Sequence, residues 1–350
     1  MGQAQTLDLV ECAGHKYGLK NASTGETVLP CIYDLIGNFR EGIAYIKLKN
    51  KWGYINKAGV QITPCQYDDV GRFNGGRAAV KIGRKYGYID ATGTQIIPCK
   101  YDNAEGFSEG MALVQLGKKF GYINENGEEI IPFQYDEAEN FEGGLAAVQI
   151  NDKYGYIDKT GKQIVPCKYE STSTFNENIL KVQLDGKFGY VDKTGTQVVA
   201  CQYDYARDFK EGLAVVKVGE KWGYINKTGE IAIPVKYDNA KDFSEKLAAV
   251  LINKRYGYID HSGTLLIPNK YEDVGGFWEG LAVVQMNGKW GYINASGTIV
   301  IPCQYDAAGW FNQGVAGVMI NSEYGYVDKT GKWFAAKDVV IESSSDDDDD

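Results

Sequence analysis

The sequence predicts an all-β protein, built as a tandem array of ten three-stranded antiparallel meanders. An aromatic residue followed by glycine recurs every 34 residues, as at Trp52, Tyr86 and Phe120. Apolar and polar residues alternate around each of these positions, which is typical of half-buried strands. Glycine and tyrosine are abundant, with 43 and 25 copies, and much of this excess falls in the repeated pattern. A fixed period of this length indicates a repeat architecture.

Each unit contains three expected strands and two tight turns. The first strand is apolar, as in residues 145–150, LAAVQI. Asn151 and Asp152 then form a two-residue turn, because Asn and Asp tolerate the positive φ of hairpin turns. The aromatic strand follows, and Asn56 and Gly59 mark a type I turn between it and the third strand. The 34-residue helical tetratricopeptide repeat shares this period, but alternation and turn residues favour strands.

A linker of constant design joins successive units, as Pro64, Asp68 and Phe73 illustrate. All eight prolines occupy this one register, and proline ends the third strand because it cannot donate to a β-ladder. We expect the aspartate to cap a single helical turn that carries the phenylalanine to the core. The following Glu-Gly, as at Glu211, is expected to re-enter a strand through a left-handed conformation.

The predicted boundaries describe a single array over residues 1–342 and an acidic tail over 343–350, which is expected to be disordered. Because the end units are atypical, the sequence favours an open superhelical β-solenoid. The alternative is a closed ten-bladed propeller-like ring, although propeller blades usually have four strands. The meanders are predicted at about 7–30, 43–64, 77–98, 111–132, 145–166, 179–200, 213–234, 247–268, 281–302 and 315–337.

Composition argues against several classes of partner. The net charge is −9, and the chain has no basic stretch that would bind nucleic acid. No apolar stretch approaches the roughly 18 residues of a membrane span. The first ten residues lack the pattern of a secretory signal, and this absence, with the cysteines discussed next, slightly favours the cytoplasm; export stays open if a leader has been removed.

The linker cysteines are expected to be free thiols without a metal or cofactor. Equivalent positions in successive units should lie about 8–12 Å apart by analogy with sheet packing, whereas a disulfide needs Cα atoms within about 7 Å. No CxxC pair suggests zinc. Phe133 and Val235 occupy the same position elsewhere, which indicates a mostly apolar slot. These cysteines are Cys31, Cys65, Cys99, Cys167, Cys201 and Cys303.

The sequence also argues against catalysis. The chain has two histidines, His15 and His261, both in expected turns. Its acidic residues recur in register, so each has a structural role in many units, whereas a catalytic site must differ from its surroundings. No glycine-rich phosphate-binding motif is present. We therefore expect a protein that is not an enzyme.

Two rows of residues are candidates for binding. The aromatic row is expected to form a stack between units, with each following glycine leaving room for a neighbouring ring; alternatively it lines a groove for sugar rings or peptide aromatics. A lysine precedes most aromatics and is expected to pair with the linker aspartate, or else to engage an acidic partner. The binding candidates are Trp52, Trp222, Trp290, Tyr154, Lys51, Lys221 and Lys289.

The Trp-Gly pairs at Trp52, Trp222 and Trp290, each preceded by lysine, resemble the WG, or KWG, repeat family of bacterial proteins. The resemblance covers about residues 7–337. It implies a β-rich interaction module and no catalytic residues. We therefore expect a non-catalytic scaffold that binds a protein partner through an extended β surface. The alternative is a module that binds carbohydrate or the cell envelope through exposed aromatic residues.

Overall fold

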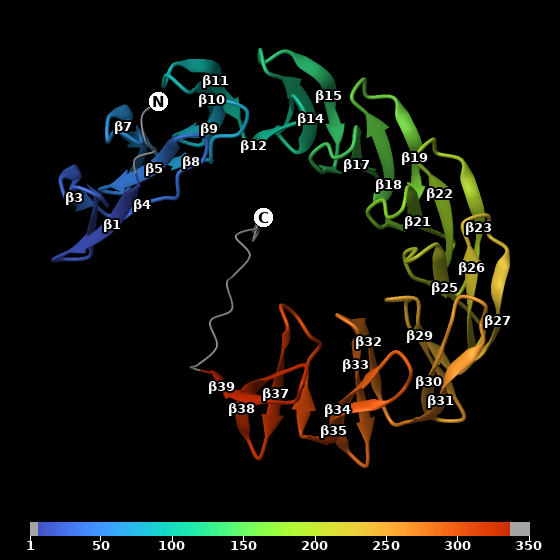
Figure 1. Ribbon diagram of the computed structural model, residues 1–350. Helices are drawn as coiled ribbons and strands as arrows, with labels where there is room; N and C mark the ends of the chain where they lie inside the picture. The colour runs from blue at the N-terminus through green and yellow to red at the C-terminus, as the bar shows by residue number, and fades with distance from the viewer. Residues whose placement is uncertain (1–5, 337–350) are drawn as a thin grey trace, which may run out of the picture. The chain divides into compact units, whose positions relative to one another are not determined.

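The structure is a computed structural model that describes residues 6–336. It contains ten separate antiparallel sheets, and the described residues form no α-helix. The prediction of an all-β tandem array is therefore confirmed (Figure 1). The chain divides into two compact units, Met1–Tyr169 and Glu170–Asp350. The choice between an open and a closed array depends on how these units are placed and stays a prediction, and the acidic tail lies outside the described residues.

The first unit contains five sheets, which we number as repeats 1 to 5. Repeat 1 has β1 (Leu7–Cys12), β2 (Lys16–Asn21) and β3 (Thr27–Tyr33). Repeat 2 has β4 (Leu35–Ile36), β5 (Ile43–Leu48), β6 (Lys51–Asn56) and β7 (Gln61–Tyr67). Repeat 3 has β8 (Asp69–Val70), β9 (Arg77–Ile82), β10 (Lys85–Asp90) and β11 (Gln95–Tyr101). Repeat 4 has β12 (Asn103–Ser108), β13 (Met111–Leu116), β14 (Lys119–Asn124) and β15 (Glu129–Tyr135). Repeat 5 has β16 (Glu137–Ala138), β17 (Leu145–Ile150), β18 (Lys153–Asp158) and β19 (Gln163–Tyr169).

The second unit contains repeats 6 to 10. Repeat 6 has β20 (Ser171–Thr172), β21 (Ile179–Leu184), β22 (Lys187–Asp192) and β23 (Gln197–Tyr203). Repeat 7 has β24 (Tyr205–Ala206), β25 (Leu213–Val218), β26 (Lys221–Asn226) and β27 (Ile231–Tyr237). Repeat 8 has β28 (Asn239–Ala240), β29 (Ala248–Ile252), β30 (Arg255–Ile259) and β31 (Leu265–Tyr271). Repeat 9 has β32 (Val274–Trp278), β33 (Leu281–Met286), β34 (Lys289–Asn294) and β35 (Ile299–Tyr305). Repeat 10 has β36 (Ala307–Ala308), β37 (Val315–Ile320), β38 (Glu323–Asp328) and β39 (Trp333–Ala335).

The predicted three-stranded meander is present in every repeat, and repeats 2 to 10 add a first strand at one edge. This edge strand comes from the linker, so the predicted helical turn is wrong. In repeat 3 the backbone N–H of Asp68 donates to the carbonyl of Lys81 at 2.9 Å, and Val70 pairs with Val80. The neighbouring strand therefore satisfies the linker backbone, and the Asp68 carboxylate caps the β9–β10 turn at Gly83, with 2.7 Å between Oδ2 and the amide nitrogen.

The turn predictions are confirmed. Asn151 and Asp152 both have positive φ, at 51° and 58°, as a primed hairpin turn requires. The side chain of Asn56 accepts hydrogen bonds from the backbone of the turn that ends at Gly59, where φ is +74°. At the strand entry, Glu211 and its glycine have φ values of 52° and 81°. The left-handed conformation expected at this Glu-Gly is thus adopted by both residues.

The hydrophobic core lies between consecutive sheets. Tyr122, Ile131 and Tyr135 of repeat 4 form one cluster with Phe141 and Val148 of repeat 5, and the clusters of other neighbouring repeats are equivalent. Because both faces of an interior sheet are covered in this way, each repeat depends on its neighbours for stability, as in other repeat proteins.

The glycine after each aromatic residue marks a bulge rather than a space for a ring. In repeat 5 a Cβ on Gly155 would lie 2.5 Å from the carbonyl oxygen of Val165 and 2.7 Å from the amide nitrogen of Cys167. The register between β18 and β19 shifts here, from Tyr154 opposite Tyr169 to Tyr156 opposite Val165. Our expectation that this glycine accommodates a neighbouring aromatic ring is therefore wrong; it accommodates the backbone of the next strand.

The prediction that Cys31 is a free thiol is also wrong, because Cys31 forms a disulfide with Cys12, with 6.2 Å between their Cα atoms. The distance argument compared equivalent positions in successive units, whereas Cys12 lies on β1 of the same sheet. Five linker cysteines form no disulfide and are half-buried, and burial raises the pKa of the Cys167 thiol. They are Cys65, Cys99, Cys167, Cys201 and Cys303. Within residues 6–336, no cluster of His, Cys, Asp and Glu suits a metal ion, and no helix is long and apolar enough to cross a membrane.

Candidate functional site

The strand register of each repeat places one aromatic ring beside the edge strand. In repeat 2, Leu35 pairs with Lys47, and Lys47 pairs with Trp52. The Trp52 ring meets the ring of Tyr45 edge-on at 5.5 Å, and Gly37 lies against the Tyr45 ring. We call the surface formed by these five positions, in repeats 2 to 5 of the first unit and in repeats 6 to 10 of the second, the aromatic face of that unit.

The predicted aromatic candidates lie on this face and are half-buried. Their inner edges pack on the cores between sheets, and their outer edges remain accessible. Neighbouring row rings contact each other through a ring of the edge strand. The centroid of the Tyr205 ring, for example, lies 5.8 Å from that of Phe188 and 5.4 Å from that of Trp222. The row is therefore a partly exposed line of rings rather than the continuous stack that we expected. The candidates of this type are Trp52, Tyr154, Trp222 and Trp290.

The predicted lysine candidates are engaged in salt bridges. Lys221, for example, binds Asp238 with 2.6 Å between Nζ and Oδ1, and the same carboxylate accepts from the backbone N–H of Asn253. These contacts hold the pKa of Asp238 below its usual value, with the lysine hydrogen bond as the largest cause. The expected pairing of this lysine row with the linker aspartates is confirmed. The other two candidates form the pairs Lys51–Asp68 and Lys289–Asp306.

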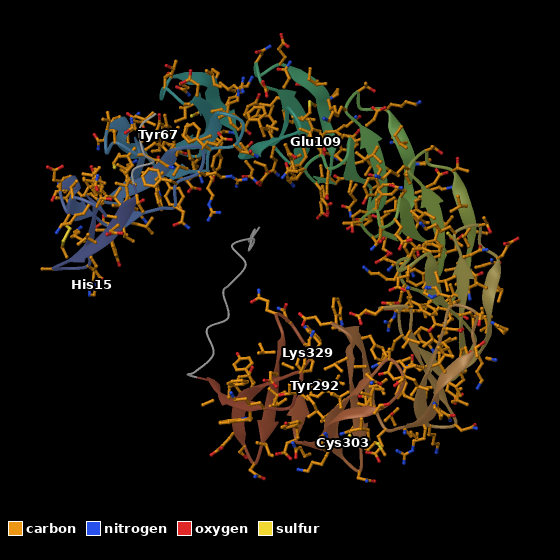
Figure 2. All side chains as sticks on the ribbon, in the orientation of Figure 1. His15, Tyr67, Glu109, Tyr292, Cys303 and Lys329 are labelled. Carbon is orange, nitrogen blue, oxygen red and sulfur yellow. A yellow bond between two sulfur atoms is a disulfide. The ribbon has the colours of Figure 1, made fainter. Side chains whose placement is uncertain are left out.

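A row of buried tyrosines that the sequence analysis missed positions the edge strands. Tyr122 is completely buried, and its hydroxyl donates to the carbonyl oxygen of Glu139 at 2.6 Å. Its ring packs on Phe141 at 4.8 Å. Burial raises the pKa of the Tyr122 hydroxyl, so it stays protonated and able to donate. The signal was a tyrosine two residues after the row aromatic. Equivalent hydroxyl bonds are made by Tyr54, Tyr88, Tyr190, Tyr224, Tyr258 and Tyr292, and Figure 2 shows Tyr292 among the strands of repeats 9 and 10.

In four repeats a lysine of the same repeat covers the row aromatic. The Nζ atom lies 4.7 to 5.7 Å from the ring centroid, a distance at which a cation is attracted to the ring face. Three of these lysines come from the second strand, and Lys241 directly follows the edge strand β28. The pairs are Lys47–Trp52, Lys81–Tyr86, Lys217–Trp222 and Lys241–Tyr256.

Three pockets occupy the same register of the aromatic face. One of about 400 Å³ lies beside Tyr86. A second, of about 320 Å³, is lined by the rings of Phe120 and Tyr154 and by the edge strand of repeat 5. A third, of about 400 Å³, lies between Trp310 and Tyr324 in repeat 10. The aromatic face is therefore hollowed beside its rings, and it is the candidate binding site.

The same aromatic-Gly register decides the family. A family model described as a WG containing repeat matches nine successive segments, which together span residues 17–324. The chain belongs to the WG containing repeat family. The sequence resemblance is thus confirmed. The matched segments are 17–52, 52–86, 86–120, 120–154, 154–188, 188–222, 222–256, 256–290 and 290–324.

Comparison with other proteins adds no function to these WG repeats. No curated protein matches the chain. A crystal structure of a eukaryotic initiation factor is 11% identical, with 95% of each chain covered and a TM-score of 0.41. The dihydro-heme d1 dehydrogenase NirN is 12% identical, with 75% of this chain and 73% of that chain covered and a TM-score of 0.31. Hsv2p of Kluyveromyces lactis is 9% identical, with 64% of this chain and 92% of that chain covered and a TM-score of 0.31.

A glutamate joins most neighbouring WG repeats. The carboxylate of Glu109 accepts from the backbone N–H of Gly144 at 3.0 Å and binds Nζ of Lys159 at 2.9 Å; Glu109 is labelled in Figure 2. The Lys159 hydrogen bond is the main reason that the pKa of Glu109 is lowered. His261 makes the corresponding contact with Glu211 at 3.2 Å. This histidine therefore has a structural partner. The equivalent glutamates are Glu41, Glu177, Glu211, Glu245 and Glu279.

WG repeats 7 to 9 carry ion pairs next to their edge strands. Arg207 and Asp242 form a pair at 3.5 Å, and burial raises the pKa of Asp242. Nε of Arg207 and Oδ1 of Asp242 are buried without a hydrogen-bond partner among the described residues. Lys241 pairs with Asp273 at 3.5 Å. This part of the face is polar, but its opposite charges are matched.

Proposed function

We propose that the chain is a non-catalytic scaffold that binds a protein partner through the aromatic face. The proposal rests on a difference between two sets of positions. Core positions keep similar residue types from repeat to repeat, whereas positions of the aromatic face vary. The first edge-strand position, for example, is Leu35 in repeat 2, Glu137 in repeat 5 and Tyr205 in repeat 7. Core positions cannot vary in this way, because they all make the same contacts. Positions that do not make these core contacts are available for recognition.

The variation favours a protein over a polysaccharide. A regular glycan presents the same group at every step, and a regular row of sites would suit it. A folded protein presents different groups at each step, and a face with acidic, basic and aromatic stretches complements such a surface. Protein interfaces are also rich in aromatic residues. Such groups are present in each unit. Glu137 and Glu139 lie in repeat 5 of the first unit, and the second unit has Arg207 in repeat 7 and, beside the face in repeat 10, the exposed Trp310.

Site-specific photo-crosslinking tests the proposal. A photoreactive phenylalanine analogue replaces Tyr205, which is 41% exposed on the aromatic face, or Ile231, which is 50% exposed on β27 away from it. In an extract of the native host, the analogue at 205 is expected to trap a discrete protein, and the analogue at 231 is not. Trapping at both positions alike, or at neither, would overturn the proposal.

Carbohydrate binding is the second candidate, and one observation favours it. In repeat 10, Trp310 and Tyr324 are 67% and 57% exposed, and they flank a pocket whose floor includes Gly309 and Gly317. Two exposed rings beside a pocket of this kind can stack on a sugar. Titration of the chain with soluble cell-wall glycans, followed by tryptophan fluorescence, checks this candidate. A spectral change that is lost in Trp310→Ala supports it, and an unchanged spectrum rejects it.

A further inference from the structure

Of the three pockets described on the aromatic face, the one between Phe120 and Tyr154 is the pocket whose charged lining residues are all acidic. Repeats 2, 3 and 7 cover the row aromatic with a lysine from the second strand, and repeat 8 does so with Lys241, which directly follows the edge strand. In repeat 5 the second-strand position is Gln149, which pairs with Tyr154. The position equivalent to Lys241 is Glu139. Both internal sources of a cation are therefore absent in repeat 5.

We infer that this pocket of repeat 5 receives the ammonium group of a lysine side chain from a protein partner. The inference rests on the proposed function and gives that function a specific site and ligand. In four other repeats a lysine of the chain lies over the equivalent ring, so these rings accept a lysine ammonium. A partner's lysine would thus replace a contact that those repeats make for themselves.

The charge of the pocket suits this occupant. Glu137 and Glu139 line it, both side chains are exposed, and no salt bridge to either is found among residues 6–336. A lysine ammonium between these carboxylates and the face of Tyr154 gains both ionic and cation–π attraction. The segment that carries the carboxylates is fixed, because the Tyr122 hydroxyl holds the carbonyl of Glu139.

The shape of the pocket suits a lysine side chain in particular. Its volume is about 320 Å³, and Ala138, Ala147 and Val148 line its apolar part. Ala147 occupies the position of Tyr45 in repeat 2, whose ring contacts Trp52, so the small side chain leaves the space open. Apolar walls beneath a charged rim match the methylene stem and ammonium head of lysine.

A titration of the full chain with capped lysine, Nα-acetyl-lysine methylamide, followed by NMR, tests the inference. We expect saturable binding with a dissociation constant on the order of millimolar, as for one small contact, and weakening by added salt. The neutral analogue with an acetylated Nε should not bind. Tetramethylammonium tests whether the site prefers a small ligand: tighter binding than capped lysine by tenfold or more would overturn the assignment to lysine.

Two variants install the missing cation. Glu139→Lys copies Lys241 of repeat 8, and Gln149→Lys copies Lys47 of repeat 2. Each is expected to weaken capped-lysine binding by about tenfold or more, because the new ammonium group competes for the Tyr154 ring and repels the ligand's ammonium. Glu129→Gln is the matched control, since it gives β15 the glutamine found on β7, β11 and β19 outside the pocket lining. It should leave binding unchanged. Thermal unfolding verifies that each variant is folded.

The outcomes separate this inference from the proposed function. If capped lysine binds the parent chain and both lysine variants alike, or does not bind the parent chain, the pocket does not receive lysine. Crosslinking from position 205 in the second unit tests the scaffold function without using this pocket. A partner trapped there despite a failed lysine titration would retain the scaffold and reject the site, whereas lysine binding without any trapped partner would reject the scaffold.

Discussion

Repeats 5 and 8 share a backbone but carry opposite charges at one place on the aromatic face. In both, a row tyrosine pairs with the second strand, Tyr154 with Gln149 and Tyr256 with Leu251. Beside these rings, repeat 5 has Glu139 and repeat 8 has Lys241. Repeat 8 thereby completes its own cation–π contact at 5.3 Å, whereas repeat 5 leaves a pocket. The comparison indicates that the core keeps the repeat constant while the charge of the face varies between repeats.

We expect the largest loss of stability from a substitution at the β-bulge that both repeats share. Gly155→Ala would place a Cβ 2.5 Å from the carbonyl oxygen of Val165, and because backbone must move, we expect a loss of about 2–3 kcal/mol in the free energy of unfolding. Urea denaturation measures it. Gly106→Ala is the control, since nothing lies within 4 Å of its added Cβ. Equal losses in the two variants would show that the bulge is not the constraint.

The next largest loss of stability is expected when the hydrogen bond that holds the edge strand is removed. Tyr122→Phe removes the hydroxyl that donates to the Glu139 carbonyl, and the expected loss is about 1–2 kcal/mol, because the bond is buried and its acceptor is left without this donor. Urea denaturation measures the loss. Tyr154→Phe serves as the control, because Phe120 and Phe188 already occupy that row position. If the two variants are equally stable, the buried hydroxyl does not fix the edge strand.

A smaller effect is expected from the glutamate that joins repeats. Glu109→Gln weakens the contacts with Gly144 and Lys159, and we expect a loss of about 0.5–1 kcal/mol at pH 7. The folded-state pKa of Glu109 is lowered, so its contribution is present above the unfolded pKa of about 4.3. It is lost as pH falls through the folded pKa.

Denaturation of the parent chain and Glu109→Gln at pH 7 and at pH 3 checks this dependence. The difference between the two proteins should shrink in acid, because protonated Glu109 no longer binds Lys159 as an ion. A difference that stays constant with pH would mean that the ionised carboxylate contributes nothing. Glu129→Gln is again the control, with no expected difference at either pH.

Some structural features of these repeats could be predicted from the sequence, and others could not. The meanders, the turns at Asn151-Asp152 and the Lys221–Asp238 bridge follow from local patterns that recur in register. The edge strand does not, because residues such as Glu137 and Ala138 adopt β structure only when β17 supplies their partners. The disulfide was missed because Cys12 stands at a strand position that is aliphatic in other repeats, such as Leu48 opposite Lys51. The pocket was missed because it depends on an absent side chain, at Ala147, and on a ring from the preceding repeat.

The smallest effect on stability is expected where the repeats differ most. Glu139→Lys gives repeat 5 the residue type that follows the edge strand in repeat 8. We expect the free energy of unfolding to change by no more than about 0.5 kcal/mol, because the side chain is exposed and surface changes of this kind are usually neutral. Thermal and urea denaturation measure the change. The equivalent position is already Gly71, Ser173 and Arg207 in other repeats, so the backbone accepts glycine, a polar residue or a cation there. A loss above about 1 kcal/mol would exceed the range expected for an exposed site and would show that the face is coupled to the core. The face could then not vary independently, and its diversity would no longer point to recognition.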